Sequence, residues 1–335
     1  MTTKRFKLLV ALVTLLGAAV GAVVGRVTTP ASIPDKTTAS APAVVASTVL
    51  PSCTTYSWLA ANNSNPFYVP GLEGWSAAAK ELGVKVDFVG PLEPNLAEQI
   101  KTLDQLVSSP NTCGVFWYAM DFTAGEPLVK EAEAKGITII IGNTDSPFKT
   151  RSGFVGTDNA GFGIEAATYA AKVINCKGSV GSIGNPGAGV SLRMDAFNKQ
   201  IKVLCPDVTV VESGMFDGSV QAAATLLDSY TSAHPDLTLL WWSEGAAGQM
   251  VQPWKEKVQA GLKTLFLATD MPPATLQAVK DGTFVGTMGQ DTFSEEWIGL
   301  HMLYNKQHGL PVPDSAFPRT LTITKDNVDK WIPKK

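Results

Sequence analysis

The sequence predicts an α/β protein that consists of two lobes in tandem. Three observations support this fold class. From about residue 54, short apolar segments alternate with segments whose apolar residues recur at helical spacing. Residues 113–119 are apolar throughout, which is typical of a strand covered on both faces. The alternation then restarts near residue 161, so the βα pattern repeats without obvious sequence repetition and implies parallel sheets with right-handed crossovers.

The first lobe is expected to begin with a strand over residues 56–61 and a turn at Pro66, followed by a helix that Gly83 ends. Alternation or continuous apolar runs then predict strands at 84–89, 113–119, 137–141 and 154–156. Helices are expected around 96–106, which stops before Pro110, and around 126–135.

The second lobe is expected to follow the same order. Its predicted strands are 179–183, 208–211, 237–242, 264–268 and 284–288, and its predicted helices are 161–174, 192–204, 221–233, 248–258 and 276–280. A last helix, 295–307, and a last strand, 319–324, remain, and a late crossing of the chain back to the first lobe accommodates them most economically.

The composition indicates the class of protein, and the first residues indicate where the protein is located. The 335 residues are 45% hydrophobic and 17% charged with a net charge of −3, which suits two globular domains and predicts no nucleic-acid partner. Lys4, Arg5 and Lys7 precede an uncharged apolar run, so residues 1–25 are expected to be a signal peptide or a membrane anchor. Residues 26–52, rich in Thr, Ala, Ser and Pro, are expected to be a disordered linker.

Four cysteines in an exported chain suggest disulfides. Cys53 and Cys113 open two strands that are parallel neighbours in a flavodoxin-like strand order, which predicts a bond between them. Cys176 and Cys205 each follow a predicted helix and precede a strand, which predicts the second bond. The alternative is four buried free thiols.

Polar or aromatic side chains gather where predicted strands end, the edge at which open α/β sheets bind ligands. Asn65, Phe67 and Tyr68 follow the first strand, although the two rings could equally pack a helix on its sheet. The planar groups of Asn, Asp and Arg can each bind two vicinal hydroxyls in bidentate fashion, and aromatic rings can pack against the C–H faces of a sugar. The sequence therefore suggests a small polyhydroxylated ligand.

Several of these polar residues also have structural interpretations. Asp158 or Asp270 can cap the helix that follows it, and Asp121 is equally suited to a cap or a turn. Arg193 lies near the start of a predicted helix, where the helix dipole disfavours a cation. This position favours a specific anionic or hydroxyl partner for Arg193 over solvent.

Four motifs occur in series: residues 63–68 (Asn-Ser-Asn-Pro-Phe-Tyr), residues 156–159 (Gly-Thr-Asp-Asn), Arg193 with Phe197, and residues 281–291. From about residue 54 to the C-terminus the chain resembles the ribose-binding-protein-like family of type I periplasmic solute-binding proteins. The resemblance implies two flavodoxin-like lobes joined by a three-stranded hinge, with a sugar cleft between them. The expected lobes are 54–157 with 291–318, and 158–290 with 319–335.

The resemblance also implies the ligand-binding residues, carried over motif by motif. They are Asn65, Phe67, Tyr68, Asn143, Thr144, Arg193, Phe216, Glu244, Asp270 and Gln290. Asp121 and Asp145, which are polar residues at the ends of predicted strands, complete the expected ligand-binding set. Asn143-Thr144 stands where ribose binders have an Asp-Arg pair, and Glu244 stands where they have an asparagine. These departures make the cleft more anionic, which suits a polyol, an amino sugar or a ligand bearing a cation.

The implied function is capture of a sugar or sugar-like polyol by lobe closure, outside the cytoplasm, and delivery to an ABC permease. The protein is expected to be monomeric and to need no cofactor. One alternative is an extracytoplasmic sensor that presents its ligand to a receptor. A sugar-responsive DNA-binding regulator is disfavoured, because an apolar export segment replaces the helix-turn-helix.

An enzyme is also disfavoured. The sequence has no nucleophile elbow, no phosphate loop and no zinc-type cysteine spacing, and the glycine-rich turn at 184–189 lacks the full dinucleotide fingerprint. The three histidines are isolated from one another in the sequence.

Overall fold

The computed structural model describes residues 53–146, 151–217 and 219–332, all of which belong to one compact unit that spans residues 45–335. The expected signal peptide or anchor over residues 1–25 and the expected linker over 26–52 lie outside the described residues. Within the described part of the chain, no helix combines the length and the hydrophobicity needed to span a bilayer.

The first sheet has six strands in the described residues, in the order β12-β5-β4-β3-β1-β2, and all of its pairings are parallel. Its first five strands therefore follow the flavodoxin-like order 2-1-3-4-5. The strands are β1 Thr55–Leu59, β2 Lys85–Val89, β3 Thr112–Trp117, β4 Thr138–Asn143, β5 Gly153–Gly156 and the short β12 Ser315–Ala316.

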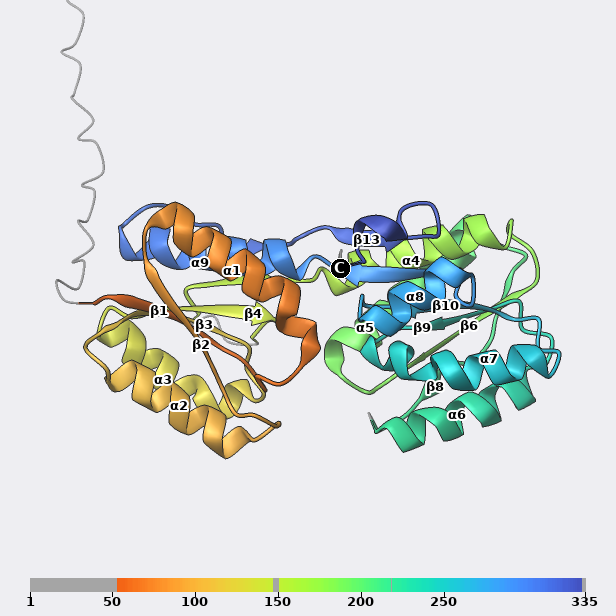
Figure 1. Cartoon of the computed structure of the whole chain (residues 1–335), viewed down its shortest axis with the longest axis horizontal. Helices are drawn as coiled ribbons and strands as arrows, with labels where there is room; N and C mark the ends of the chain where they lie inside the picture. Colours follow the sequence, from red (N-terminus) through yellow and green to blue (C-terminus); the bar gives the residue numbers. More distant parts are fainter. Residues whose placement is uncertain (1–52, 147–150, 218, 333–335) are drawn as a thin grey trace, which may run out of the picture. The chain divides into compact units, whose positions relative to one another are not determined.

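Helices cover both faces of the first sheet, with α1 and α9 on one face and α2 and α3 on the other (Figure 1). Because side chains alternate along a strand, Phe116 of β3 stacks on Trp75 of α1, whereas Val115 and Trp117 face the opposite core. The elements are the 3₁₀ turn η1 Pro66–Tyr68, α1 Val69–Leu82, α2 Leu96–Ser108, α3 Phe122–Ala134 and α9 Thr292–Gln307.

The second sheet repeats this order as β13-β11-β10-β9-β6-β7, with β8 also paired to β6. The last strand, β13, is antiparallel to β11, and the other pairings are parallel. The strands are β6 Ser179–Gly184, β7 Thr209–Val210, β8 Gly214–Met215, β9 Leu239–Trp242, β10 Leu265–Thr269, β11 Gly286–Gln290 and β13 Thr320–Ile323.

Helices α4 and α5 pack together on one face of the second sheet, and α6, α7 and α8 lie on the other (Figure 1). Consecutive tryptophans of β9 divide between these faces: Trp241 packs against Phe197 of α5, and Trp242 stacks on Phe266 of β10. The elements are α4 Asn159–Val173, α5 Ala188–Leu204, α6 Val220–Ala233, the 3₁₀ helix η2 Gly245–Met250, α7 Val251–Gln259, α8 Pro273–Asp281 and the 3₁₀ helix η3 Val328–Lys330.

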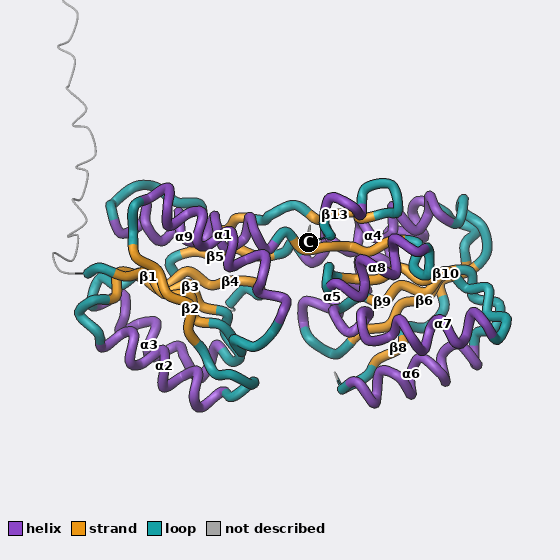
Figure 2. The backbone as a smooth tube through the Cα atoms, viewed as in Figure 1, coloured by secondary structure: helices purple, strands orange, loops and turns teal. Residues whose placement is uncertain are grey.

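The chain passes from one sheet to the other three times, after β5, after β11 and after β12, through short loops that Figure 2 shows in teal. Side chains link these connections. Thr157 Oγ1 donates to Gln290 Oε1 at 2.7 Å, and Arg319 Nε lies 3.4 Å from Asp291 Oδ2. The helix that follows β11 packs on the first sheet, as the predicted late crossing requires.

Both expected disulfides are present. Cys53 pairs with Cys113 and Cys176 with Cys205, with Cα–Cα distances of 5.0 and 5.1 Å. The first bond joins the amino-terminal ends of β1 and β3, which are hydrogen-bonded neighbours. The second joins the chain after α4 to the end of α5, the two helices that share one face of the second sheet.

Some element bounds differ from the prediction for local reasons. The predicted strand 284–288 is shifted to Gly286–Gln290, because Phe284, although buried, bonds to the carbonyl of Ala278 in the turn after α8. The helix predicted at 192 begins at Ala188, so it includes part of the glycine-rich segment. The helix predicted at 248–258 is divided into η2 and α7.

Candidate functional site

A hydrogen-bonded network lies at the carboxyl-terminal edge of the second sheet, with Gln290 at its centre. Gln290 ends β11 and is buried. Its Nε2 donates to Asp270 Oδ1 at 2.8 Å, and its Oε1 accepts from Thr157 Oγ1 at 2.7 Å and from Arg193 Nη2 at 3.0 Å. Three of the predicted site residues, Arg193, Asp270 and Gln290, are therefore brought together, and the Gln290 amide is fixed in orientation.

Arg193 is oriented on every side of its guanidinium. It is only 7% exposed, its Nε donates to Asn159 Oδ1 at 2.6 Å, its Nη1 donates to the Ser243 carbonyl at 3.4 Å, and its Cζ lies 4.4 Å from the centre of the Phe162 ring. Burial lowers the pKa of Arg193, and the nearby carboxylates of Asp270, Glu244 and Glu295 oppose that shift. Arginine nevertheless stays charged, so this is a buried cation whose N–H groups are set for directional hydrogen bonds in the plane of the guanidinium.

Asp270 follows β10 with φ of 65°, in the left-handed region that non-glycine residues seldom adopt. Its backbone N–H bonds to the Met288 carbonyl at 2.7 Å, and its own carbonyl accepts from Thr287 Oγ1 at 2.7 Å. Burial raises the pKa of the Asp270 carboxyl, whereas Arg193 and the Gln290 amide lower it. Backbone strain of this kind accumulates where a side chain must point in one direction for function.

Glu244 and Phe216 complete this edge of the second sheet. Both carboxylate oxygens of Glu244 accept hydrogen bonds, Oε1 from the indole of Trp242 and Oε2 from the N–H of Ala246 at 2.9 Å. Burial is the main cause that raises the pKa of Glu244, and Asp270 adds to it. Phe216 is buried and packs on Trp242 with ring centroids 5.6 Å apart. Arg193 thus lies among carboxylates, so this edge is rich in hydrogen-bond acceptors.

The first sheet presents Asn65, Phe67 and Tyr68 after β1. Asn65 is exposed and its Oδ1 accepts from the N–H of Phe67 at 3.0 Å, which forms the turn that leads into α1. Phe67 is half-buried and meets Tyr68 edge-on at 5.5 Å. Tyr68 packs edge-on against Trp58 and Tyr118, so it contributes mainly to the core of this lobe.

Asn143, Thr144 and Asp145 follow one another at the end of β4. Asn143 has φ of 64°, so β4 and β10 both lead into an Asn or Asp in the left-handed conformation. Thr144 is exposed, and its Oγ1 lies 3.4 Å from Asn143 Oδ1. Asp145 is held by Arg151 through a 2.6 Å ion pair, so its carboxylate has a structural partner.

Asp121 caps α3 through hydrogen bonds from the N–H groups of Thr123 and Ala124 at 2.8 and 3.2 Å. Asp158 and Asp270 are the two aspartates that the sequence offers as helix caps. Asp158 caps α4 through the N–H of Gly161, whereas Asp270 joins the Gln290 network instead. The role of the whole predicted set in ligand binding stays a prediction.

Substitution of Asp121 tests how much this helix cap contributes to stability. Asp121→Ala is expected to lower the free energy of unfolding by about 1 kcal/mol, whereas Asp121→Asn, which keeps the cap, is expected to leave it unchanged. Urea unfolding followed by circular dichroism measures both variants. Equal losses in the two variants would mean that the capping bonds do not stabilise α3.

Sequence reasoning missed several residues of the site. Asn159 accepts from Arg193 and Thr157 donates to Gln290, and both belong to the motif at 156–159, but neither is among the predicted ligand-binding residues. Trp242 was expected only as a strand residue, yet it donates to Glu244. Glu295 and Glu296 were assigned to a helix without further role. No sequence signal marked them, because acidic residues in the first turn of a helix are common.

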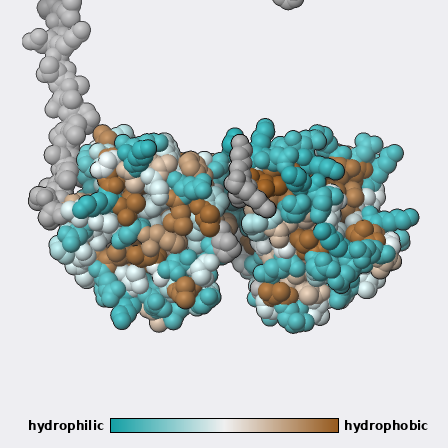
Figure 3. All heavy atoms as spheres, viewed as in Figure 1, coloured by the Kyte–Doolittle hydropathy of each residue, from teal (hydrophilic) through white to brown (hydrophobic). Residues whose placement is uncertain are grey.

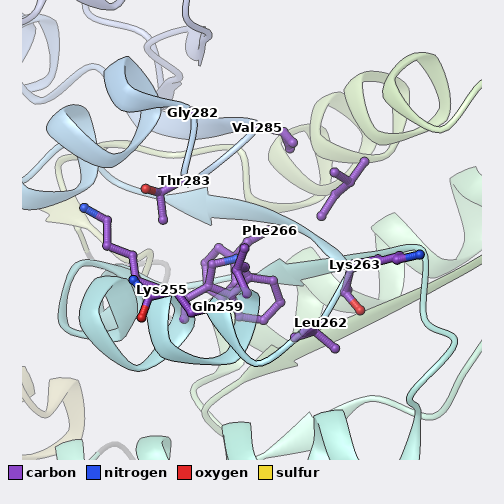
Figure 4. A pocket seen from close by; sticks show the side chains of 12 residues that line it. Lys255, Gln259, Leu262, Lys263, Phe266, Gly282, Thr283 and Val285 are labelled. Carbon is purple, nitrogen blue, oxygen red and sulfur yellow. The ribbon is translucent and has the colours of Figure 1, made fainter.

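An open depression of about 570 Å³ lies elsewhere, at the amino-terminal ends of β10 and β11 (Figure 4). Its lining includes Lys255, Gln259, Lys263, Phe266 and Thr283. Lys255 is already paired with Asp281 at 3.1 Å. Ligands of open α/β sheets bind at the opposite, carboxyl-terminal edge, so this depression is not the candidate site.

On the face shown in Figure 3, apolar residues form small separate patches among hydrophilic ones, as is normal for a soluble protein surface. Among the described residues, no group of three or more His, Cys, Asp or Glu side chains is placed to hold a metal ion.

Two sheets of flavodoxin-like order, linked by three crossings of the chain, define the class of two-lobed α/β binding proteins. A family model described as a periplasmic binding protein domain matches residues 56–310. The chain therefore belongs to the periplasmic binding protein family, which is a family of binding proteins and not of enzymes. A search of curated proteins finds no match to this chain.

Solved structures share the fold. A sugar-binding protein of a sugar ABC transporter from Bacillus halodurans is 22% identical, with a TM-score of 0.78, covering 83% of this chain and 99% of its own. AraP, an arabinose-binding protein from Geobacillus stearothermophilus, is 23% identical, with a TM-score of 0.77 and the same coverage. A periplasmic solute-binding protein from Actinobacillus succinogenes 130z with bound D-allose is 18% identical, with a TM-score of 0.75, covering 83% and 100%. At these identities the likeness concerns the fold.

Proposed function

We propose that this protein captures a sugar or sugar-like polyol outside the cytoplasm and delivers it to an ABC permease. The observation that carries the proposal is the network of Arg193, Gln290 and Asp270 at the carboxyl-terminal edge of the second sheet. A buried cation, an amide and a carboxylate on adjacent elements match the alternating donors and acceptors of neighbouring hydroxyl groups. Structural neighbours described with D-allose and arabinose support a monosaccharide-sized ligand.

Capture proceeds by closure of the two lobes. The three connections are short, and each is tied to the next by the Thr157–Gln290 and Arg319–Asp291 contacts, so rotation is confined to a few residues. Gln290 belongs both to this hinge region and to the candidate site. A ligand that contacts both lobes binds the closed state more tightly and shifts the population toward it.

A thermal-shift screen identifies the ligand. Pentoses, hexoses, polyols and amino sugars are added to the folded protein at millimolar concentration, because a ligand that binds only the native state raises its melting temperature. We expect at least one neutral sugar or polyol to stabilise the protein, with a dissociation constant then measured by calorimetry. A screen in which no carbohydrate or polyol shifts the melting temperature would contradict the proposed function.

The Glu244 carboxylate is expected to favour a cationic ligand over a neutral one. Glu244→Gln removes the carboxylate, and its amide N–H₂ must face one of the two N–H donors that the carboxylate accepts from, at a cost of about 1–3 kcal/mol. We expect Glu244→Gln to be less stable without ligand than the unmodified protein. We also expect it to lose more affinity for a cationic amino sugar than for the neutral sugar. If the variant loses the same factor of affinity for both, Glu244 does not select for charge.

A further inference from the structure

A phenol hydroxyl and two buried carboxyl groups converge beside the first sheet. Tyr118 directly follows β3 and is buried. Glu295 and Glu296 lie in the first turns of α9, and these two side chains are at most 1% exposed. The Tyr118 hydroxyl lies 2.6 Å from Glu295 Oε1 and 2.5 Å from Glu296 Oε1. A phenol has one hydrogen and can donate to only one of these oxygens. The second short contact therefore needs a hydrogen that a carboxyl group supplies.

The packing leaves this cluster little means of accommodating two negative charges. Glu296 Oε2 is buried without a hydrogen-bond partner, and its carboxyl group lies against Gly71 of α1, where a Cβ would approach within 2.6 Å of Cδ. A buried carboxylate with an unpaired oxygen is costly, and a neutral carboxylic acid costs much less. The geometry thus favours one proton shared within the cluster.

Charged and titratable groups face the cluster from several elements. Asp291, at the start of α9, is acidic and disfavours a second charge on Glu295 and Glu296. Tyr68, before α1, interacts with both carboxyls, and Arg193 of α5 is the cation placed near Glu295. Burial raises the pKa of Glu295 to about 7, and burial together with Glu295 raises the pKa of Glu296 further above its usual range.

The cluster also reaches the rim of the first sheet. The backbone N–H of Asn143, the left-handed residue that ends β4, faces the Glu295 carboxyl and lowers its pKa. The Tyr118 ring packs against Gly142, where a Cβ would come within 2.1 Å of Cε1. A change in the cluster therefore acts directly on the backbone that carries Asn143.

We propose that Tyr118, Glu295 and Glu296 share a proton and act as positioning residues for Asn143, so that loss of this proton at alkaline pH weakens ligand capture. The role of Asn143 rests on the proposed function, whereas the shared proton does not.

The sign of the pH effect follows from the direction of the shifts. Groups whose folded pKa is raised contribute stability that is fully present below the unfolded pKa, near 4.5 for glutamate, and that is lost as the pH rises through the folded value. The melting temperature of the ligand-free protein is therefore expected to fall between about pH 6 and pH 9.

Glu296→Gln supplies a permanent N–H donor and removes one ionisable group, so its melting temperature is expected to change much less over this range. Glu165→Gln, at an exposed position on α4, is the matched control and is expected to follow the unmodified protein.

Infrared spectroscopy of the unmodified, ligand-free protein gives a readout that survives a poorly folding variant. A protonated carboxylic acid band should be present at pH 6 and should weaken as the pH rises to 9, and Glu296→Gln should lack this pH-dependent loss. Absence of the band at pH 6, or a melting temperature equally pH-dependent in Glu296→Gln, would overturn the shared proton.

Calorimetry then tests the positioning role with the sugar that the screen identifies. Its affinity is expected to fall about tenfold from pH 6 to pH 9 in the unmodified protein and in Glu165→Gln, and to stay nearly constant in Glu296→Gln. Binding that is equally strong at both pH values in the unmodified protein would overturn the positioning of Asn143. If no sugar binds at any pH, the proposed function fails, and the infrared result still decides the shared proton.

Discussion

Asparagine in place of Asp270 is expected to weaken sugar binding by about 100-fold, because a hydrogen bond to a charged group contributes about 1.5–3 kcal/mol and 1.4 kcal/mol corresponds to tenfold. The Asp270 carboxylate accepts from Gln290 at 2.8 Å and is the charge partner of Arg193. Asparagine keeps the size, an acceptor for Gln290 and a tolerance for the left-handed backbone at this position. The loss therefore reports on charge and not on collapse of the turn.

Asp195→Asn is the matched control for this substitution. Asp195 lies on α5 two residues from Arg193, but it is exposed. Calorimetric titration of the sugar from the screen should give an unchanged dissociation constant for Asp195→Asn and about a 100-fold larger one for Asp270→Asn. Equal affinity in Asp270→Asn and the unmodified protein would remove Asp270 from the site.

Loss of the Cys53–Cys113 disulfide is expected to lower the free energy of unfolding by about 4 kcal/mol. The bond closes a sequence separation of 60 residues, and the loss of chain entropy that it imposes on the unfolded state grows with loop length. Cys53→Ala with Cys113→Ala removes it. The Cys176–Cys205 bond closes only 29 residues, so removing that pair is expected to cost less, about 3.5 kcal/mol.

Urea unfolding of both double variants measures these losses, and sugar affinity is the accompanying control. Cys53 precedes β1 and Cys113 lies near the start of β3, at the edge of the first sheet opposite the candidate site, so affinity should not change. Four free thiols in the denatured, unreduced protein would show that neither bond forms.

The fold followed from the sequence because its signals are local and repeated. Apolar strands such as Val115–Trp117 need cover on both faces, and residues such as Gly83 end helices by adopting a left-handed conformation, here φ 66°. Element ends were less predictable. Phe284 is apolar enough for a strand, yet a hydrogen bond to Ala278 keeps it in a turn.

The site could be predicted only in part, because a side chain's role depends on contacts between distant residues. Asp158 and Asp270 look alike in sequence, each preceding a helix, but one caps and the other binds Gln290. Asp145 was predicted as a ligand residue, and nothing local indicates that Arg151 holds it. Glu295 and Tyr118 are 177 positions apart, so their hydrogen bond has no sequence signal at all.

A crystal structure of the protein with the sugar from the thermal-shift screen would show directly which side chains bind the ligand. We expect sugar hydroxyls to be hydrogen-bonded to Arg193, Asp270 and Gln290, and the sugar's other side to lie against residues that follow β1 of the first lobe. A sugar bound instead in the depression near Lys255 and Lys263, or with no contact to those three side chains, would contradict this expectation.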